Sequence, residues 1–219
     1  EGCEKLKYVY IADGGEKIGF FSTFAACPLE MVYIGRDVTI AQDGPFLNNN
    51  KIKYLFWGPR TTIVGNADSY YEGKGLTYKF CGGNAECNVI FLGDELSGNL
   101  NIDSNGDLSK IKHYYVNRNI TGNCHNAENS GLFDACETVE FGPFVTTIAE
   151  NSFESQSVGK PLTAVDFNQA YNLETIGDCA FRGCDKWNGA LDFSTMKVKN
   201  LGRFAFSESG VKSVVFNEE

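Results

Sequence analysis

Several features that would point to common protein classes are missing from this sequence. Its 219 residues contain no run of eighteen apolar residues, so no segment is predicted to span a membrane as a helix. No cluster of Lys and Arg stands out and the net charge is −9, so nucleic acid is not an expected partner. The eight cysteines include no paired Cys-x-x-Cys spacing. We therefore expect neither a metal nor a cofactor.

Histidine, the side chain most often used as a catalytic base, is also scarce. The chain has only His113 and His125, and although Cys124 precedes His125 directly, neither lies in a nucleophile elbow or a metal-spacing motif. No pair of carboxylates stands out as a glycosidase pair. We predict a protein without enzymatic activity; the alternative is a carbohydrate-active enzyme built on a repeat scaffold.

The residues that are present can form a folded core. The chain is 42% hydrophobic and 21% charged, which makes disorder unlikely in composition terms. It opens at Glu1 without a Met or a signal peptide, and we interpret it as a mature or trimmed product. Cys81 and Cys87 are spaced to bridge a short loop, or to remain unpaired thiols.

The sequence repeats internally, most clearly in its last third. One motif pairs an apolar residue with a phenylalanine five residues later, at Ile148–Phe153, Ile176–Phe181 and Leu201–Phe206. A second motif follows each, with an apolar residue, two variable residues, an apolar-x-apolar core and a turn former. Its copies begin at Leu6, Leu29, Ile52, Leu76, Ile111, Cys136, Leu162, Trp187 and Val211.

These starting points are 23 to 26 residues apart, apart from one step of 35 between Leu76 and Ile111. The long step predicts an insertion near 94–108, a stretch rich in Ser, Asn, Gly and Asp. The Leu76 copy is imperfect because Lys79 falls on an inward position, and a register shift that turns Tyr78 and Phe80 inward is the alternative there. The Trp187 copy carries one extra residue before Leu191. We predict a single domain over 1–219 with about nine repeats.

The apolar-x-apolar core alternates with period two and therefore predicts a short strand. Turn formers at one recurring site after it allow the chain to leave the strand sharply. Stacked units of this kind form a parallel sheet on one side, and each buries its apolar face against its neighbours. Between these strands we expect short strands, turns and single helical turns.

The run from Ile176 to Cys184, Ile-Gly-Asp-Cys-Ala-Phe-Arg-Gly-Cys, resembles the BspA-like leucine-rich repeats of bacterial and protozoan surface proteins. The resemblance is recognisable at 21–35 and weakest at 63–126. It implies a leucine-rich-repeat solenoid of the right-handed β/α superhelix type, in an extracellular or cell-surface protein used for adhesion or recognition. It carries over no catalytic residue. It also implies that Cys27, Cys136 and Cys184, at a recurring turn position, are buried structural thiols.

The strand register predicts which side chains point outward, because the third and fifth residues of each motif share the outer face of the sheet. The first five strands would present aromatic residues there. We predict a ligand-binding surface for a protein or glycan made of Tyr8, Tyr10, Tyr33, Tyr54, Phe56, Tyr78, Phe80, His113 and Tyr115. Two alternatives remain: the residues stabilise the sheet through cross-strand contacts, or they support self-association.

The following strands would present the carboxylates Glu140, Asp166 and Asp192 on the same face. Like charges in adjacent strands repel, so these groups are either solvated or relieved by a bound cation such as calcium. The last motif, Val211–Asn217, leaves Val214 and Phe216 near an open end of the solenoid. We expect that end to be covered in part by a neighbouring chain, as a possible self-association.

Overall fold

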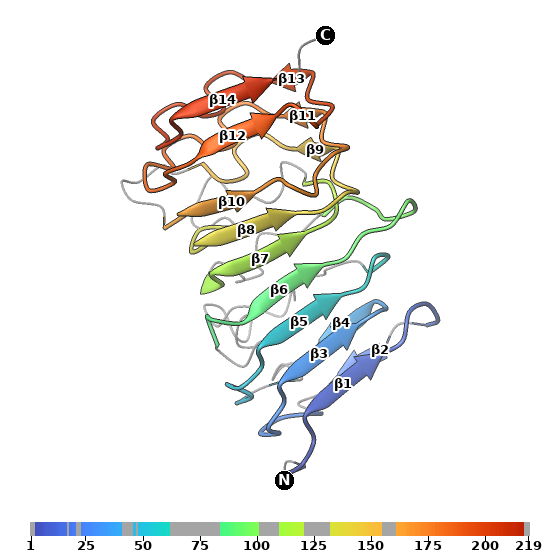
Figure 1. Ribbon diagram of the computed structural model, residues 1–219. Coiled ribbons are helices and arrows are strands. Elements are labelled where there is room, and N and C mark those ends of the chain that lie inside the picture. The colour runs from blue at the N-terminus through green and yellow to red at the C-terminus, as the bar shows by residue number, and fades with distance from the viewer. Residues whose placement is uncertain are drawn as a thin grey trace.

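The computed structural model describes residues 3–16, 18–20, 23–40, 46, 48–61, 84–100, 110–120, 132–154 and 161–216. These residues form fourteen β-strands, and they contain no α-helix. The chain winds as a stack of rungs, with the N-terminal rung at one end and the C-terminal rung at the other (Figure 1). The protein is therefore a parallel-strand β-solenoid.

The main sheet takes one strand from each rung. Its seven strands, all parallel, are β1 (Tyr8–Ile11), β3 (Met31–Ile34), β5 (Tyr54–Trp57), β6 (Asn88–Phe91), β7 (His113–Val116), β8 (Thr138–Phe141) and β10 (Ala164–Asp166). Two further parallel strands, β12 (Ala190–Phe193) and β14 (Ser213–Phe216), continue the stack beyond β10 as a separate pair (Figure 1). The predicted alignment of Val32 with Leu55, and of Val139 with Val165, is confirmed.

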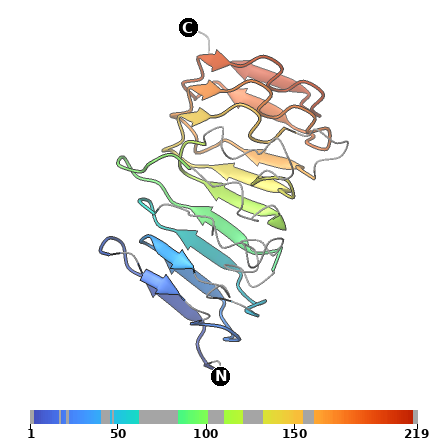
Figure 2. The same ribbon diagram turned by 180° about the vertical axis from the view of Figure 1, so that it is seen from behind.

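Shorter strands lie on the opposite side of the solenoid (Figure 2). In the C-terminal half these are β9 (Thr147–Ile148), β11 (Thr175–Ile176) and β13 (Asn200–Leu201), and near the N-terminus β2 (Ile18–Phe20) pairs with β4 (Val38–Ile40). The strands and turns expected between the main strands are thus present in the described residues. The handedness of the superhelix stays a prediction.

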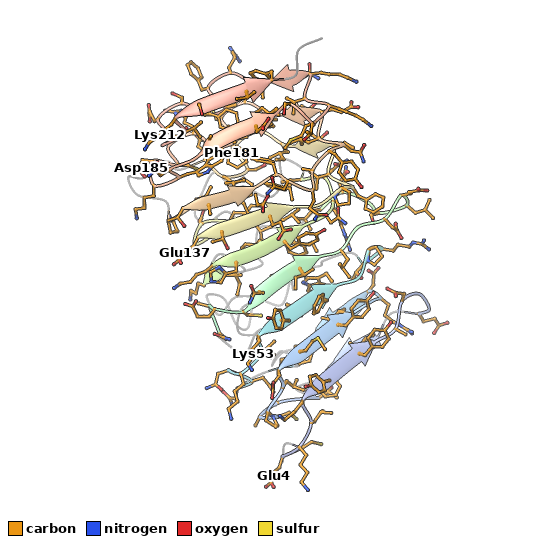
Figure 3. All side chains as sticks on the ribbon, in the orientation of Figure 1. Glu4, Lys53, Glu137, Phe181, Asp185 and Lys212 are labelled. Carbon is orange, nitrogen blue, oxygen red and sulfur yellow. The ribbon has the colours of Figure 1, made fainter. Side chains whose placement is uncertain are left out.

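The interior holds a stack of phenylalanine rings, one from each C-terminal rung. Ring centroids are 4.3 Å apart for Phe133 and Phe153, 5.0 Å for Phe153 and Phe181, and 5.6 Å for Phe181 and Phe206. Phe181, labelled in Figure 3, is fully buried, as is Phe153. Because the same sequence position recurs in each rung, one residue type builds the whole stack and no rung buries its face alone.

Three of the cysteines singled out by the sequence are buried, as predicted. Cys27, Cys136 and Cys184 all lie in the core as free thiols. The Cys184 sulfur donates to the Phe153 carbonyl oxygen at 3.3 Å. Cys87 is also a buried free thiol, whereas Cys81, its suggested partner, lies outside the described residues.

The prediction for the fourth main strand is wrong. The place between β5 and β7 is taken by β6, whose Asn88 and Ile90 pair with Tyr54 and Phe56 on one side. The predicted strand at Tyr78 and Phe80 lies outside the described residues and does not hold that place. The insertion is also misplaced: residues 58–87 form the longest connection between consecutive main strands, while 92–112 is as long as 117–137.

Arg118 joins three rungs through hydrogen bonds to main-chain oxygens. Its buried guanidinium donates to the carbonyl oxygens of Leu92 and Thr61, both at 2.6 Å, and to that of Gly58. Burial lowers the pKa of Arg118 to about 10, which leaves the group charged at neutral pH. Because these carbonyls come from two earlier turns of the chain, one side chain fixes the end of β7 against β5 and β6.

The hydrogen-bonded main sheet is interrupted between β10 and β12. In the described part of the chain β10 pairs only with β8, and β12 pairs only with β14. The spacing from Val165 to Leu191 is 26 residues, the same as from Val139 to Val165, so the number of residues in the rung does not by itself account for the interruption. Val165, on the last strand before the break, is only partly buried, unlike its counterparts Val32, Leu55 and Val139.

At the C-terminal end, β14 has all four residues exposed, including Val214, Val215 and Phe216. Among the described strands its only neighbour is β12. No helix in the described part of the chain is long and apolar enough to cross a membrane.

Candidate functional site

Two rows of side chains cross the outer face of the main sheet. The register places them in line from β1 to β10: the first row is Tyr8, Met31, Tyr54, Asn88, His113, Thr138 and Ala164, and the second is Tyr10, Tyr33, Phe56, Ile90, Tyr115, Glu140 and Asp166. Period-two alternation turns both rows away from the core, where Val and Leu side chains fill the other face. The aromatic surface predicted from the sequence is therefore contiguous, apart from the β6 positions.

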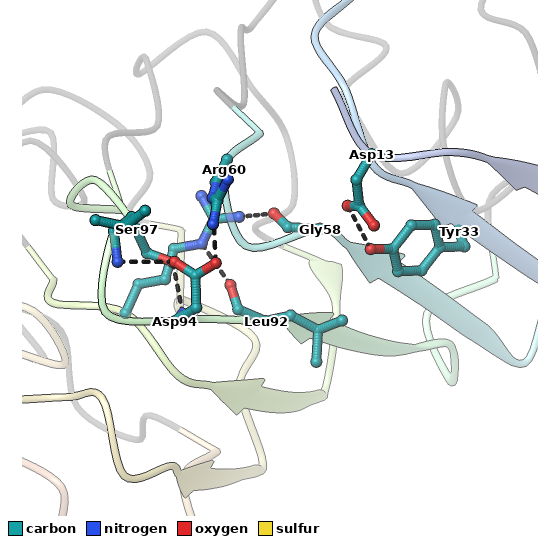
Figure 4. Close-up of polar contacts among 9 residues, drawn as sticks. Asp13, Tyr33, Gly58, Arg60, Leu92, Asp94 and Ser97 are labelled. Atoms are coloured by element: carbon teal, nitrogen blue, oxygen red, sulfur yellow. Dashed lines mark hydrogen bonds and ion pairs between the residues drawn. The ribbon is translucent and has the colours of Figure 1, made fainter. Parts of the chain in front are cut away.

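The aromatic half of this face is exposed and partly ordered by its own contacts. Tyr8 and Tyr10 are 59% and 68% exposed, and Tyr54 is 46% exposed. The rings of Tyr10 and Tyr33 stack with centroids 4.7 Å apart, and the Tyr33 hydroxyl donates to Asp13 at 2.7 Å (Figure 4). Burial, followed by the Asp13 carboxylate, raises the pKa of Tyr33, so this hydroxyl stays protonated at neutral pH. Tyr10 and Tyr33 thus make the kind of cross-strand contact that the alternative role, stabilisation of the sheet, predicts.

Glycine at the turns allows the rungs to approach closely beside Tyr33. A Cβ on Gly58 would lie 2.8 Å from the Gly35 Cα and 3.0 Å from the Tyr33 hydroxyl. Beyond this turn, Arg60 and Asp94 form an exposed ion pair at 3.2 Å, and Asp94 also accepts from Ser97 (Figure 4). Only a residue without a side chain fits at Gly58. Glycine at this turn position therefore allows Tyr33 and the Gly35 turn to pack against the next rung.

The sequence missed the two β6 positions, Asn88 and Ile90. The segment Val89-Ile90-Phe91 followed by Gly93 has the apolar-x-apolar core and a turn former, which would have marked it. It escaped because only one residue separates the buried Cys87 from Val89, whereas two separate Ile52 from Leu55 in the standard unit. Of the predicted surface, Tyr8, Tyr10, Tyr33, Tyr54, Phe56, His113 and Tyr115 lie on the outer face of described strands.

His113 contacts side chains of both neighbouring rungs. Its Nδ1 lies 2.9 Å from the Thr138 hydroxyl, and its Nε2 lies 3.5 Å from a Glu86 carboxylate oxygen. Lys112 stands beside it and pairs with both Glu86 and Glu137. Glu137, labelled in Figure 3, lies at the edge of the sheet where the main strands begin. These contacts give His113 a role in joining neighbouring rungs.

A groove of about 670 Å³ crosses the outer face over β5 to β12. Tyr54, His113 and Tyr115 stand at its N-terminal side, and Glu140, Asp166 and Asp192 at its C-terminal side. The change from large to small residues, with Thr138, Ala164 and Ala190 following the aromatic positions, hollows the surface. The lining also includes the buried residues Leu191 and Met196, so the groove extends across the break between β10 and β12.

Two carboxylates of the groove, Asp166 and Asp192, accept local hydrogen bonds from the backbone. Asp166 accepts from the Asn168 backbone N–H at 2.7 Å, and Asp192 accepts from that of Ser194 at 2.9 Å. The Ser194 hydrogen bonds keep the pKa of Asp192 below its ordinary value. Burial and the charge of Glu140 raise the pKa of the neighbouring Tyr115.

The calcium interpretation is not supported for these carboxylates. Among the described residues, no three His, Cys, Asp or Glu side chains gather closely enough to hold a metal ion. Glu140 and Asp166 do lie on paired strands, but Asp192 lies on β12, across the break from Asp166. The assumption of evenly paired strands in this part of the sheet was wrong.

A stack of repeated rungs with a continuous outer sheet face is the form of a leucine-rich-repeat solenoid. Comparison with protein families agrees: the BspA type leucine rich repeat region matches residues 1–72 and 128–219, with six copies. This chain belongs to that family. The match omits 73–127, which includes the eroded middle seen in the sequence and the whole of β6 and β7. Neither the comparison with curated proteins nor that with solved structures finds a match.

Proposed function

We propose that this chain is a non-enzymatic recognition or adhesion module that binds a protein or glycan partner through the outer face of its main sheet. The observation that carries the proposal is the set of exposed and half-buried aromatic side chains on β1, β3 and β5, with His113 and Tyr115 on β7, next to a groove on the same sheet face. Exposed apolar patches of this kind usually mark interaction surfaces. Tyrosine suits the role, because its ring offers apolar area and its hydroxyl a polar contact at little entropic cost.

BspA-type repeats are typical of exported or surface proteins, and the proposal places this protein outside the cytoplasm on that ground. The repeat motif is structural, as Ile176, Ala180 and Phe181 illustrate by lying fully buried. It supplies no catalytic group, which supports a binding role over the alternative of a carbohydrate-active enzyme.

Self-association is the second candidate, and the exposed β14 favours it. Val214, Val215 and Phe216 present apolar side chains beside an unpaired strand edge. A second copy of the chain docked there would bury them. The solution mass measured over a range of concentrations tests this: a rise with concentration that the Phe216→Lys substitution abolishes supports it, and a mass that stays monomeric rules it out.

The binding role is tested by a protein and glycan array screen with the wild-type chain and a Tyr54→Ala variant. Tyr54 lies where the aromatic surface meets the groove, and loss of a central aromatic contact costs on the order of 2 kcal/mol or more in binding, roughly 30-fold. We expect the strongest binder to lose at least about 10-fold in affinity for the variant.

The matched control is Phe204→Ala, which removes an exposed ring far from this face, at a turn that follows β13. It should bind like wild type. Equal binding by wild type and Tyr54→Ala, or an equal loss in both variants, would show that the aromatic surface is not the binding site.

A further inference from the structure

We propose that the groove over β5 to β12 binds an extended peptide segment that carries arginine or lysine side chains. This inference deepens the proposed function and rests on it, since it assumes that the outer sheet face is a binding surface. It names the class of partner and the residues that select it: Glu140, Asp166 and Asp192, with Tyr54 and Tyr115 beside them.

The first argument is the charge balance of the sheet. Carboxylates at the margin where the main strands begin are matched by cations from neighbouring rungs: Glu30 lies between Lys7 and Lys53, and Lys112 lies between Glu86 and Glu137. Glu174 and Asp178, on the opposite side, are likewise paired with Lys199 and Arg203.

The three groove carboxylates are different. Glu140, Asp166 and Asp192 have no ion-pair partner in the described part of the chain, unlike the carboxylates at the margin where the main strands begin. Glu140 and Asp166 oppose each other on adjacent strands, which stand about 4.8 Å apart. Stacked like charges repel, and a cation supplied by a partner would relieve that repulsion. Its binding would therefore be more favourable here than at the strand margin, where lysines already match the carboxylates.

The second argument concerns which cation fits. A metal ion needs several ligands around one point, and the described residues offer no such cluster. A guanidinium spans neighbouring carboxylates with its fork of N–H donors, and successive basic side chains of a peptide can meet charges spread over several strands. The spread of Glu140, Asp166 and Asp192 over β8, β10 and β12 therefore favours a basic peptide.

The aromatic side of the groove suits the same ligand. Tyr54 and Tyr115 line it together with the carboxylates. A guanidinium or ammonium group is attracted to the face of a tyrosine ring, and the methylene stem of Arg or Lys packs on apolar surface. One basic side chain can thus contact a ring with its stem and a carboxylate with its head.

The third argument is independent of charge and concerns the peptide backbone. The Ala164 N–H bonds to the Glu137 carbonyl oxygen in the direction of β8. Alternate residues of a parallel strand bond to opposite neighbours, so the N–H and C=O of Val165 point toward β12. No hydrogen bond joins β10 to β12 in the described residues, and Val165 lines the groove. These two backbone groups therefore have no strand partner in the described part of the chain, which leaves a donor and an acceptor open to a ligand bound at the break in the sheet.

The test uses a fluorescein-labelled eight-residue peptide of alternating Arg and Gly, followed by fluorescence anisotropy. We expect saturable binding to the full chain, with at least about 10-fold weaker affinity for the triple variant Glu140→Gln, Asp166→Asn, Asp192→Asn. In that variant the amide oxygens of the new asparagines can still accept from the Asn168 and Ser194 backbone N–H groups. The variant should therefore fold like wild type, which circular dichroism and the thermal midpoint verify.

The matched control is the triple variant Glu4→Gln, Glu150→Gln, Glu208→Gln, which removes the same charge from exposed positions outside the groove. It should bind the peptide like wild type. An equal loss in both triple variants would mean that binding follows net charge alone and would overturn the proposal, as would no binding at all. Calcium binding that the groove variant abolishes, measured by calorimetry, would also overturn it in favour of a metal site.

The same experiment separates this inference from the proposed function. If the array ligand requires Tyr54 but the Arg–Gly peptide does not bind, the outer face is a binding surface for another class of partner and this inference alone fails. If Tyr54→Ala leaves array binding unchanged while the groove variant loses the peptide, the aromatic surface fails and the groove stands.

Discussion

Replacing Phe153 with alanine is expected to lower the free energy of unfolding by about 3–5 kcal/mol. The side chain is fully buried and lies in the ring stack between Phe133 and Phe181, with an edge contact to Phe141. Removing it opens a cavity that adjacent rungs cannot fill without giving up their own stacking. Urea denaturation followed by circular dichroism measures the loss.

Because each rung contacts only its neighbours, the loss should also be local. Amide hydrogen exchange is expected to speed up most in the rungs of Phe133, Phe153 and Phe181, and less in β1 and β3. Phe204→Ala is the control, since Phe204 is 66% exposed and its removal should change stability by less than about 0.5 kcal/mol. Similar losses in the two variants would contradict a continuous ring stack.

Replacing Arg118 with methionine is expected to cost at least about 2 kcal/mol of stability. Methionine fills much of the same volume but removes the Arg118 donor from the carbonyl oxygens of Thr61 and Leu92, while that of Gly58 keeps the Thr61 N–H. Each buried acceptor that loses its partner costs about 1–3 kcal/mol. Denaturant unfolding of the variant measures this cost, with protection from hydrogen exchange falling at β5, β6 and β7.

Arg60→Met is the matched control for this prediction. Arg60 is exposed and pairs with Asp94 at the surface, a type of contact worth about 0–1 kcal/mol. A loss at Arg118 no larger than that at Arg60 would mean that the three carbonyls find water or other donors, and that Arg118 does not join the rungs.

Much of the fold could be predicted from the sequence because a solenoid repeats one structural unit. The same apolar positions build every rung, so the strands at 31–34, 54–57 and 138–141 follow from counting residues between copies of a motif. The motif count assigned the wrong segment to the strand between β5 and β7. The unit that contains β6 lacks one residue of the standard spacing, and the count used the alternating pattern at 76–80 instead. A period-two pattern alone does not show which segment takes a given place in the sheet.

The candidate site was predicted only in part, for a related reason. The row from Tyr10 to Asp166 followed from alternation along each strand. The groove did not, because it depends on the end of the hydrogen-bonded sheet at β10, and the repeat pattern continues through that break. The role of Arg118 could not be predicted from the sequence. Its hydrogen-bond acceptors lie 26 to 60 residues earlier in the chain, and no local sequence pattern indicates a contact between residues so far apart.

Hydroxyl-radical footprinting with the strongest binder from the array tests most directly whether the outer sheet face is the functional surface. With the binder present, we predict reduced oxidation of Tyr54 and Tyr115, which line the groove, and unchanged oxidation of Phe204, which lies outside it. Protection at Phe204 with none at Tyr54 and Tyr115 would contradict this assignment and place the binding surface elsewhere on the solenoid.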